Sequence, residues 1–386
     1  MNQLQKHFSG ILRSKEEILA EIRSKSMLHT QFYSWTPKQQ ENFLSICTGA
    51  KGMRILSDAF FKEVMNPEYD KGRMEGFLGT ILGKNVKVLQ VLPNDSTRIA
   101  DEVTLLVTDI VVELEDGSIA NVEVQKIPYH FPGGRCACYS SDLMLRQYKR
   151  IRDQCKNTTF SYKSIKTVYL IVLYETSPTE LKNVPSFYVH HAKQVFDTGV
   201  DLDLLQEYVL IALDNFKETM QNKSIETKTE AWLTFLSCDE PDKIIELIKQ
   251  YPEFEAMYQT LYQVCLNTER VMAMFSEELY ELDRNTIKLM IEEQQEKLDA
   301  LNAELAAKSK EMEERLENSK AELENNKAEL ENNKAELENS KAELENSKAE
   351  LESSKVEIAS QKEVLLEKDR MIKMLKERLA KLGEVM

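Results

Sequence analysis

Polar side chains stand at strand positions where apolar residues are expected, and their types suit metal-dependent chemistry. Asp109 shares one face of a predicted strand with Val107 and Val111, because side chains alternate along a strand with period two. Glu123 and Gln125 likewise share one face of the next predicted strand. Carboxylate oxygens are preferred ligands of hard divalent cations, Mg²⁺ above all, with Mn²⁺ as the substitute. The pattern therefore indicates a divalent-metal site.

The turn between these strands decides whether the two carboxylates meet. If residues 115–117 form a three-residue loop with Gly117 in the left-handed conformation, Asp109 lies directly opposite Glu123. Opposed side chains are about 5 Å apart at Cβ, so two carboxylates there repel unless a cation lies between them. A two-residue loop at 116–117 would shift the register by one residue and separate the pair.

The spacing of apolar residues predicts the elements that position these side chains. A change from helical to alternating period occurs near residue 86, and a loop is expected at 128–134. The order of elements predicts an α/β fold with a mixed sheet flanked by helices. Helices are predicted at 55–65, 71–82, 138–153 and within 228–290, and strands at 86–92, 103–114, 119–127, 167–174 and within 187–216.

Asp109 followed by Glu123-Val124-Gln125 resembles the D…(D/E)-x-(K/Q) signature of the PD-(D/E)XK nuclease superfamily. Residues 40–290 resemble its Rpn-type recombination-promoting nuclease and transposase family. The segments that carry this resemblance are DAFFK (58–62), RMEGFLGTILG (73–83), DIVVELEDGSIANVEVQK (109–126) and GGRCACYSSDLMLRQY (133–148).

The resemblance implies a restriction-endonuclease-like fold and a DNA endonuclease that hydrolyses phosphodiester bonds. Asp109 and Glu123 would hold the metal, with the Val124 carbonyl as a third ligand. Gln125 stands where most of the superfamily has a lysine. An amide can position water but cannot act as a base, because it does not change charge.

Further residues extend the predicted site. Glu75 lies in line with apolar residues of its helix and resembles the first-helix glutamate of the superfamily; the alternative is the edge of an amphipathic helix. Arg135 and Arg146 would hold DNA phosphates, or are ordinary surface residues. Lys126 is a further candidate for phosphate, although it is expected to point to the face opposite Gln125.

The chain is acidic both before residue 292 and from residue 292 onward. The net charge is −15; residues 292–386 carry 25 acidic and 17 basic side chains, net −8, which leaves −7 for the rest. A DNA-binding protein of this composition must use local Lys/Arg clusters.

The six cysteines form no CxxC pair, which argues against structural zinc and for reduced thiols in the cytoplasm. No apolar run is long enough for a membrane helix.

The C-terminal quarter is a heptad repeat. Variants of KAELENN place a leucine or isoleucine every seven residues, beginning with Leu316 and Leu323, in one column along the helix. The second core position of each heptad is Ser or Asn through the middle of the repeat. This predicts a weak coiled coil and a homo-oligomer, with a solvated single helix as the alternative. The expected division is a helical segment (1–50), a nuclease-like core (51–225), a helical extension (226–290) and the coiled-coil tail (291–386).

These features together predict a metal-dependent DNA endonuclease of the Rpn type, linked to recombination or mobile elements. Two alternatives stay open. The first is a nuclease fold that has lost catalysis and acts as an interaction module through its tail. The second is a structural coiled-coil protein with a globular cap, which would not need Asp109, Glu123 and Gln125 where they stand.

Overall fold

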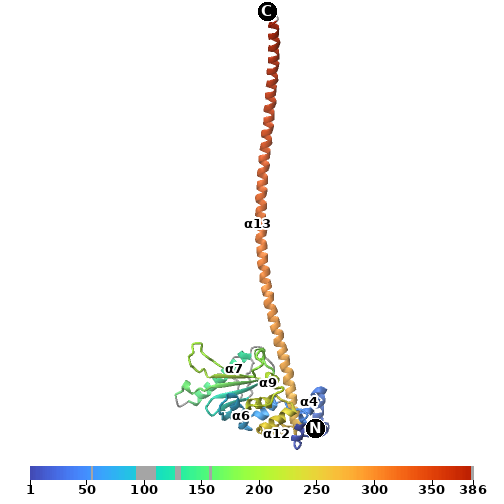
Figure 1. Ribbon diagram of the computed structural model, residues 1–386, viewed down its shortest axis with the longest axis vertical. Helices are drawn as coiled ribbons and strands as arrows, with labels where there is room; N and C mark the ends of the chain where they lie inside the picture. The colour runs from blue at the N-terminus through green and yellow to red at the C-terminus, as the bar shows by residue number, and fades with distance from the viewer. Residues whose placement is uncertain (54, 93–109, 127–131, 156–158, 384–386) are drawn as a thin grey trace. The chain divides into compact units, whose positions relative to one another are not determined.

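The computed structural model describes the chain except for residues 54, 93–109, 127–131, 156–158 and 384–386 (Figure 1). It consists of two compact units, residues 1–293 and 294–386. The first unit contains a six-stranded sheet in the order β1-β2-β3-β4-β6-β5. Its strands are β1 (Val88–Val91), β2 (Ile110–Leu114), β3 (Ile119–Gln125), β4 (Val168–Tyr174), β5 (Val189–Lys193) and β6 (Gln206–Ala212).

The sheet is mixed, which confirms the predicted α/β class. Strands β1, β2 and β3 are antiparallel neighbours, whereas β3, β4 and β6 run parallel and β5 is antiparallel to β6. Parallel neighbours need a crossover connection, and helix α7 (Pro132–Gln154) supplies it between β3 and β4. All seven residues of β4 are buried, as expected for a central strand covered on both faces.

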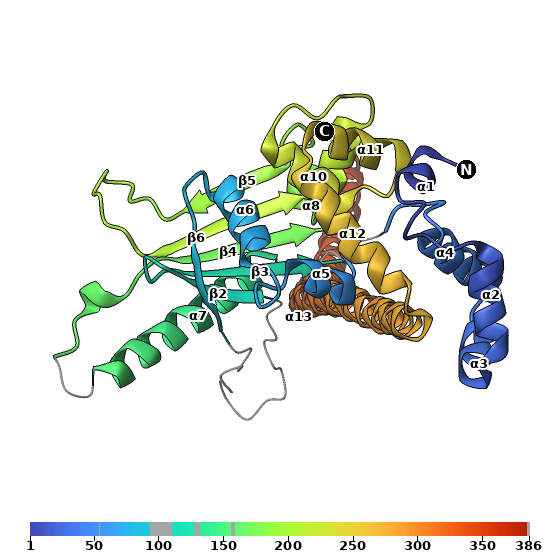
Figure 2. The ribbon, with the colours of Figure 1, turned by 90° about the horizontal axis from the view of Figure 1, so that it is seen from below.

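Helices cover both faces of the sheet (Figure 2). Helix α7 lies on one face, where Val111, Ile119 and Val168 pack with Leu143. The main core lies on the other face and receives the alternate strand residues, such as Val122. The helices of that side are α5 (Asp58–Met65), α6 (Lys71–Leu82), α9 (Leu213–Met220), α10 (Lys228–Ser237), α11 (Pro241–Gln250) and α12 (Glu253–Cys265). Two short pieces, the 3₁₀ turn η1 (Tyr162–Ser164) and α8 (Thr179–Lys182), lie in connections.

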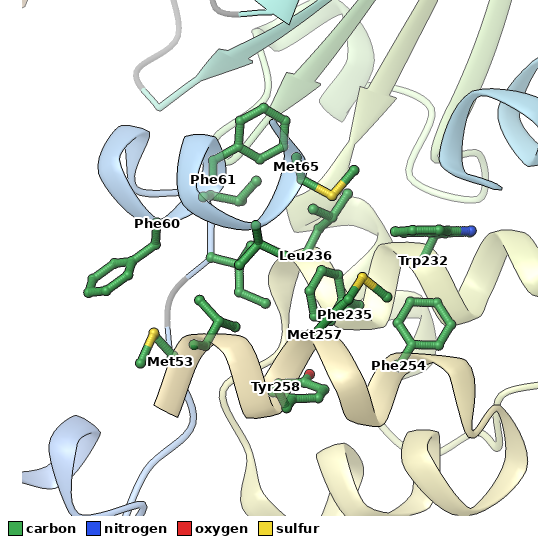
Figure 3. Packing of buried hydrophobic residues seen from close by; sticks show 14 of the residues in the cluster. Met53, Phe60, Phe61, Met65, Trp232, Phe235, Leu236, Phe254, Met257 and Tyr258 are labelled. Carbon is green, nitrogen blue, oxygen red and sulfur yellow. The ribbon is translucent and has the colours of Figure 1, made fainter. Parts of the chain in front are cut away.

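Aromatic side chains join α5, α10 and α12 in the main core (Figure 3). Trp232 and Phe254 meet with ring centroids 4.9 Å apart, and Phe235 and Tyr258 with centroids 5.2 Å apart. Both contacts are edge-to-face, a geometry that adds to the hydrophobic gain from burying the rings. Residues of α10 and α12 belong to the same buried cluster as strand residues such as Val122, so the helical extension is part of the same core as the sheet.

The N-terminal helices are α1 (Gln3–His7), α2 (Lys15–Ser24), α3 (Ser26–Ser34) and α4 (Pro37–Cys47). Capping boxes are present at Ser14 and Thr36, where each hydroxyl accepts from the backbone N–H three residues later. Trp35 packs against Phe275 with centroids 5.0 Å apart. This contact ties the segment to the start of the last helix.

Helix α13 (Thr268–Gly383) begins in the first unit and forms the second. Val271, Met272 and Phe275 near its start are buried. From residue 294 to 379 every side chain is exposed, and the leucines of the heptad column between 316 and 351 are 57–59% exposed in the single chain. Across the described residues, none of the helices has the length and apolar character of a membrane crossing.

Helix α7 begins earlier than expected. Pro132-Gly133-Gly134, which were predicted to be loop, form the first turn of the helix, and residues 128–131 of the predicted loop lie outside the described residues. Proline fits a first turn because its missing N–H has no partner there, and the glycines follow the conformation that the rest of the helix imposes.

Candidate active site

The β2–β3 hairpin sets the register at the centre of the predicted site. Gly117 has φ +83° and donates its N–H to the Leu114 carbonyl at 2.9 Å. Ile110 pairs with Val122, the register that a three-residue loop requires. The three-residue alternative is therefore correct. Asp109, the predicted partner of Glu123, lies outside the described residues.

Three polar residues form a row on the α7 face of β3. Asn121, Glu123 and Gln125 are 0%, 4% and 8% exposed. They alternate with Ala120 and Val122, which belong to the main core. Burial of a carboxylate and two amides on one strand is costly unless each has a polar or ionic partner, so the row is an expected place for chemistry.

Arg135, in the first turns of α7, faces this row. Its Nη2 lies 3.8 Å from Oε1 of Glu123. The same guanidinium donates to the Tyr139 hydroxyl, from Nη2 at 2.6 Å and from Nε at 3.1 Å. About a third of the Arg135 side chain stays exposed. The arginine is therefore oriented by Tyr139 while it remains accessible to a ligand.

A small cavity of about 10 Å³ separates β3, β4 and α7 at this point. It is lined by Glu123, Gln125, Arg135, Cys136, Tyr139, Val172 and Tyr174. A cavity of this size holds at most one water molecule or ion, so a nucleotide would have to bind at its mouth.

The cysteine of the cavity is not a nucleophile. Burial raises the pKa of Cys136, and its Sγ lies 3.8 Å from the Tyr174 hydroxyl. Burial also raises the pKa of Tyr174. Both groups are neutral at physiological pH, and only thiolates attack efficiently. The groups of this cavity that can bind a metal ion, water or phosphate are therefore the carboxylate of Glu123, the amide of Gln125 and the guanidinium of Arg135.

The other two predicted phosphate-binding residues lie elsewhere. Arg146 is eleven residues beyond Arg135 on α7, about 16 Å along the helix, and its Nη2 is 2.5 Å from Oδ2 of the buried Asp142. Lys126 forms an ion pair with Glu278 of α13 at 2.6 Å, with side chains 6% and 12% exposed. The structure brings Arg135 to Glu123, whereas Arg146 and Lys126 form ion pairs with Asp142 and Glu278.

A model of the PD-(D/E)XK nuclease family transposases matches residues 55–289, more than half of the 386-residue chain. The chain belongs to this family. The match spans the whole sheet, α7 and the start of α13. No individually curated protein is significantly similar in sequence. A PD-(D/E)XK transposase of this kind is expected to have a nuclease-like function, and enzymes of the superfamily use divalent metals.

The oxygen atoms available at this site are of the kind that binds a divalent metal ion. Glu123 and Gln125 offer carboxylate and amide oxygens, which hard divalent cations prefer. Neither amide atom of Asn121 has a hydrogen-bond partner among the described residues. Within that part of the chain, no three His, Cys, Asp or Glu side chains cluster closely enough to hold a metal. Asp109, the other metal ligand predicted from the sequence, lies outside it.

Glu75 of α6 is engaged at the start of β1. Its Oε2 accepts from Lys87 Nζ at 2.8 Å, and its Oε1 accepts from the Val88 N–H at 2.9 Å. Burial would raise the pKa of Glu75, but these hydrogen bonds outweigh it and lower the pKa. The carboxylate is therefore held ionised by contacts within its own surroundings.

The register separates these contacts from the candidate site. Val88 pairs with Leu114, whereas Ile110 at the other end of β2 pairs with Val122 beside Glu123. Four residues of strand span about 13 Å. Glu75 is therefore held at the end of β2 that is farther from Glu123.

We expect Glu75→Gln to lower the free energy of unfolding by about 1–2 kcal/mol at pH 7, because the charged acceptor of two hydrogen bonds is removed. The folded-state pKa lies below the usual value, so this stabilisation is present above pH 4.5 and is lost as the pH falls through the folded-state pKa. Urea denaturation at several pH values should show the two proteins converging as the pH falls through the folded-state pKa of Glu75. A difference that stays constant with pH would contradict this account.

Sequence patterns could have identified some contributors and not others. Asn121 continues the period-two row of Glu123 and Gln125, and Asp142 stands one helical turn before Arg146. Both signals are local and readable. Glu278 lies 152 residues from Lys126, and no local pattern connects the two.

Proposed function

We propose that this protein is a metal-dependent DNA endonuclease that hydrolyses phosphodiester bonds. One observation carries the proposal: Glu123 and Gln125 are buried on one face of β3, beside the partly exposed Arg135. In a PD-(D/E)XK chain these are the positions of the acidic ligand, the water-positioning residue and a phosphate contact. Like the Rpn-type proteins it resembles, it would act in recombination or in mobile elements.

Each side chain has a role that follows from its chemistry. Asp109 and Glu123 would hold Mg²⁺ or Mn²⁺, which when bound supplies an activated water and stabilises charge on the scissile phosphate. Gln125 would orient water through its amide without taking a proton. Arg135 would bind a phosphate oxygen with the guanidinium that Tyr139 orients. Arg146 and Lys126 are paired with Asp142 and Glu278 and would contribute less.

The test is plasmid nicking by the full-length protein at low salt, with Mg²⁺, Mn²⁺ or EDTA. Nicking with either metal and none in EDTA is the expected result. Absence of nicking under all three conditions, in protein that binds divalent metal, would remove the enzymatic proposal.

The second candidate function is a nuclease fold that has lost catalysis and serves as an interaction module. The observation that favours it is Gln125, buried at 8% exposure where a lysine would stand. Retention of divalent-metal binding, measured by calorimetry, separates the two functions. An interaction module has no use for the metal, so weak or absent binding would favour it.

We also propose that the tail forms a coiled coil that joins copies of this chain. Its support is the leucine column, which is 57–59% exposed in the single chain and needs a partner surface to be buried. Half of the seam is polar, so the association should be weak.

A chain ended after Glu293 should keep a cooperative melt and sediment as a smaller species than the full-length protein. The reason is that residues 1–293 form one compact unit with its own core, whereas the leucine column lies beyond it. Analytical ultracentrifugation at matched concentrations measures this. If both chains have the same number of subunits, the tail does not join them.

A further inference from the structure

Aromatic rings cluster on the surface where α7 ends and the chain returns to β4. Phe160 and Tyr162 meet with centroids 5.0 Å apart at 79°, and Phe160 and Tyr148 with centroids 5.3 Å apart at 87°. Tyr162 is nonetheless 72% exposed. Its ring is held by its neighbours and presents a face to solvent, which is an arrangement suited to stacking.

The same segment is strongly basic in an acidic protein. Residues 145–166 contain seven Lys or Arg and one acidic residue, net +6, against −15 for the chain. Arg152 donates to the Tyr148 hydroxyl at 2.7 Å, with its guanidinium 5.8 Å from the ring centroid. Lys149, Lys163 and Lys166 are exposed, and no described residue forms an ion pair with them. This is a local cluster of the kind that nucleic-acid binding requires here.

We propose that this surface binds single-stranded DNA, with Tyr162 stacked on an unpaired base and the lysines against phosphates. We call it the aromatic–basic patch: Tyr148, Lys149, Arg152, Phe160, Tyr162, Lys163 and Lys166. Bases inside a duplex are covered by their neighbours, so an outward-facing ring can stack only on a base that is unpaired or terminal. The inference rests on the proposed function for its choice of DNA and deepens it by naming the strand state.

The patch is distinct from the candidate active site. Tyr148 lies thirteen residues beyond Arg135 on α7, about 20 Å along the helix axis. Helix α7 runs along one face of the sheet and leads from one region to the other (Figure 2). At the 3.4 Å rise per nucleotide of a strand in duplex DNA, this separation corresponds to roughly six nucleotides, and an extended single strand spans it with fewer. A strand cut at Glu123 would therefore have to extend about that far to gain from the patch.

The experiment measures binding without cleavage. Fluorescence anisotropy of labelled 30-nucleotide oligo(dT) is followed with the full-length protein in EDTA. Tyr162→Ala should weaken binding by about 5- to 150-fold, the range found when a stacking ring is removed. Tyr162→Phe keeps the ring face and should bind like the natural protein. Tyr69→Ala is the matched control, because Tyr69 is 67% exposed and lies outside the patch.

The lysines are tested by salt dependence. Lys163→Gln with Lys166→Gln should reduce the slope of log Kd against log salt by about 1.4, because each phosphate that a lysine neutralises on a single strand contributes roughly 0.7 to that slope. Lys6→Gln, an exposed lysine of α1, should leave the slope unchanged.

Three results would overturn the proposal: no binding of oligo(dT), equal binding by Tyr162→Ala and Tyr69→Ala, or tighter binding of a blunt duplex than of the single strand. These outcomes are separable from failure of the nuclease proposal. If the protein binds oligo(dT) through Tyr162 but never nicks plasmid with Mg²⁺ or Mn²⁺, the single-strand-binding proposal stands and the nuclease proposal is contradicted.

Discussion

Glu123→Gln should reduce DNA cleavage by more than ~100-fold, since the substitution keeps the shape of the side chain and deletes the charge that would hold the metal. Glu123 is 4% exposed and lies 3.8 Å from Arg135, so the change is confined to the candidate site. Initial rates of plasmid nicking with Mg²⁺ measure the effect. Asp109→Asn should cause a loss of similar size.

The control for this experiment is Glu113→Gln. Glu113 is a partly buried carboxylate on β2 that accepts from Arg150 at 2.8 Å and from Gln90 at 2.6 Å. The Glu113→Gln variant should cleave DNA at a rate within a few-fold of that of the natural protein, although its free energy of unfolding will be lower. Equal rates for Glu123→Gln and the natural protein would remove Glu123 from catalysis and contradict the proposed site.

Metal-free stability gives an independent readout for the same site. Two carboxylates that share a site repel, so Asp109→Asn should raise the free energy of unfolding by up to ~1 kcal/mol without metal. Mg²⁺ should then raise the melting temperature of the natural protein only, because a ligand stabilises the state that binds it. If Asp109→Asn is less stable than the natural protein without metal and Mg²⁺ still raises its melting temperature, Asp109 has a structural role and is not a metal ligand.

Lys126→Met should lower the free energy of unfolding by about 3–5 kcal/mol. The Lys126–Glu278 pair is 2.6 Å long with side chains 6% and 12% exposed, and loss of one partner leaves a buried charge uncompensated. Urea denaturation of the full-length protein measures the change. Lys126→Met combined with Glu278→Leu should recover most of the loss, because no charge is then left buried.

The matched control is the Lys308–Glu304 pair of the tail. It has the same 2.6 Å separation but side chains 71% and 60% exposed. Lys308→Met should cost no more than ~0.5 kcal/mol, as exposed i,i+4 pairs contribute little. Equal small effects at Lys126 and Lys308 would mean that the Lys126–Glu278 pair is hydrated and does not hold β3 to α13.

Capping residues, turn residues and side-chain periodicity predicted the helix ends and the hairpin register, which depend on neighbouring residues in the sequence. Helix α6 spans the predicted residues 71–82, because the Asp70 side chain caps its start and Gly83 ends it at φ +64°. The hairpin register also followed from the sequence, once Gly117 allowed a three-residue loop. The side-chain alternation that buries Glu123 follows from the same register.

Long-range contacts account for what the sequence did not predict. The partner of Lys126 comes from α13, and the two oxygens of Glu75 are taken by residues at the start of β1, a contact that helical periodicity does not encode. Arg146 was assigned to phosphate although Asp142 stands one turn before it on the same helix. Residue type and face were predictable, whereas the choice of partner required the tertiary structure.

The heptads of α13 make its length adjustable in fixed steps. Each seven-residue unit adds about 10.5 Å of helix, and its near-identical neighbours make one unit interchangeable with the next. Gain or loss of a whole unit keeps the leucine column in line, whereas any single-residue insertion would rotate everything beyond it by about 100°. Such a tail can lengthen or shorten between related chains without any compensating change in residues 1–293.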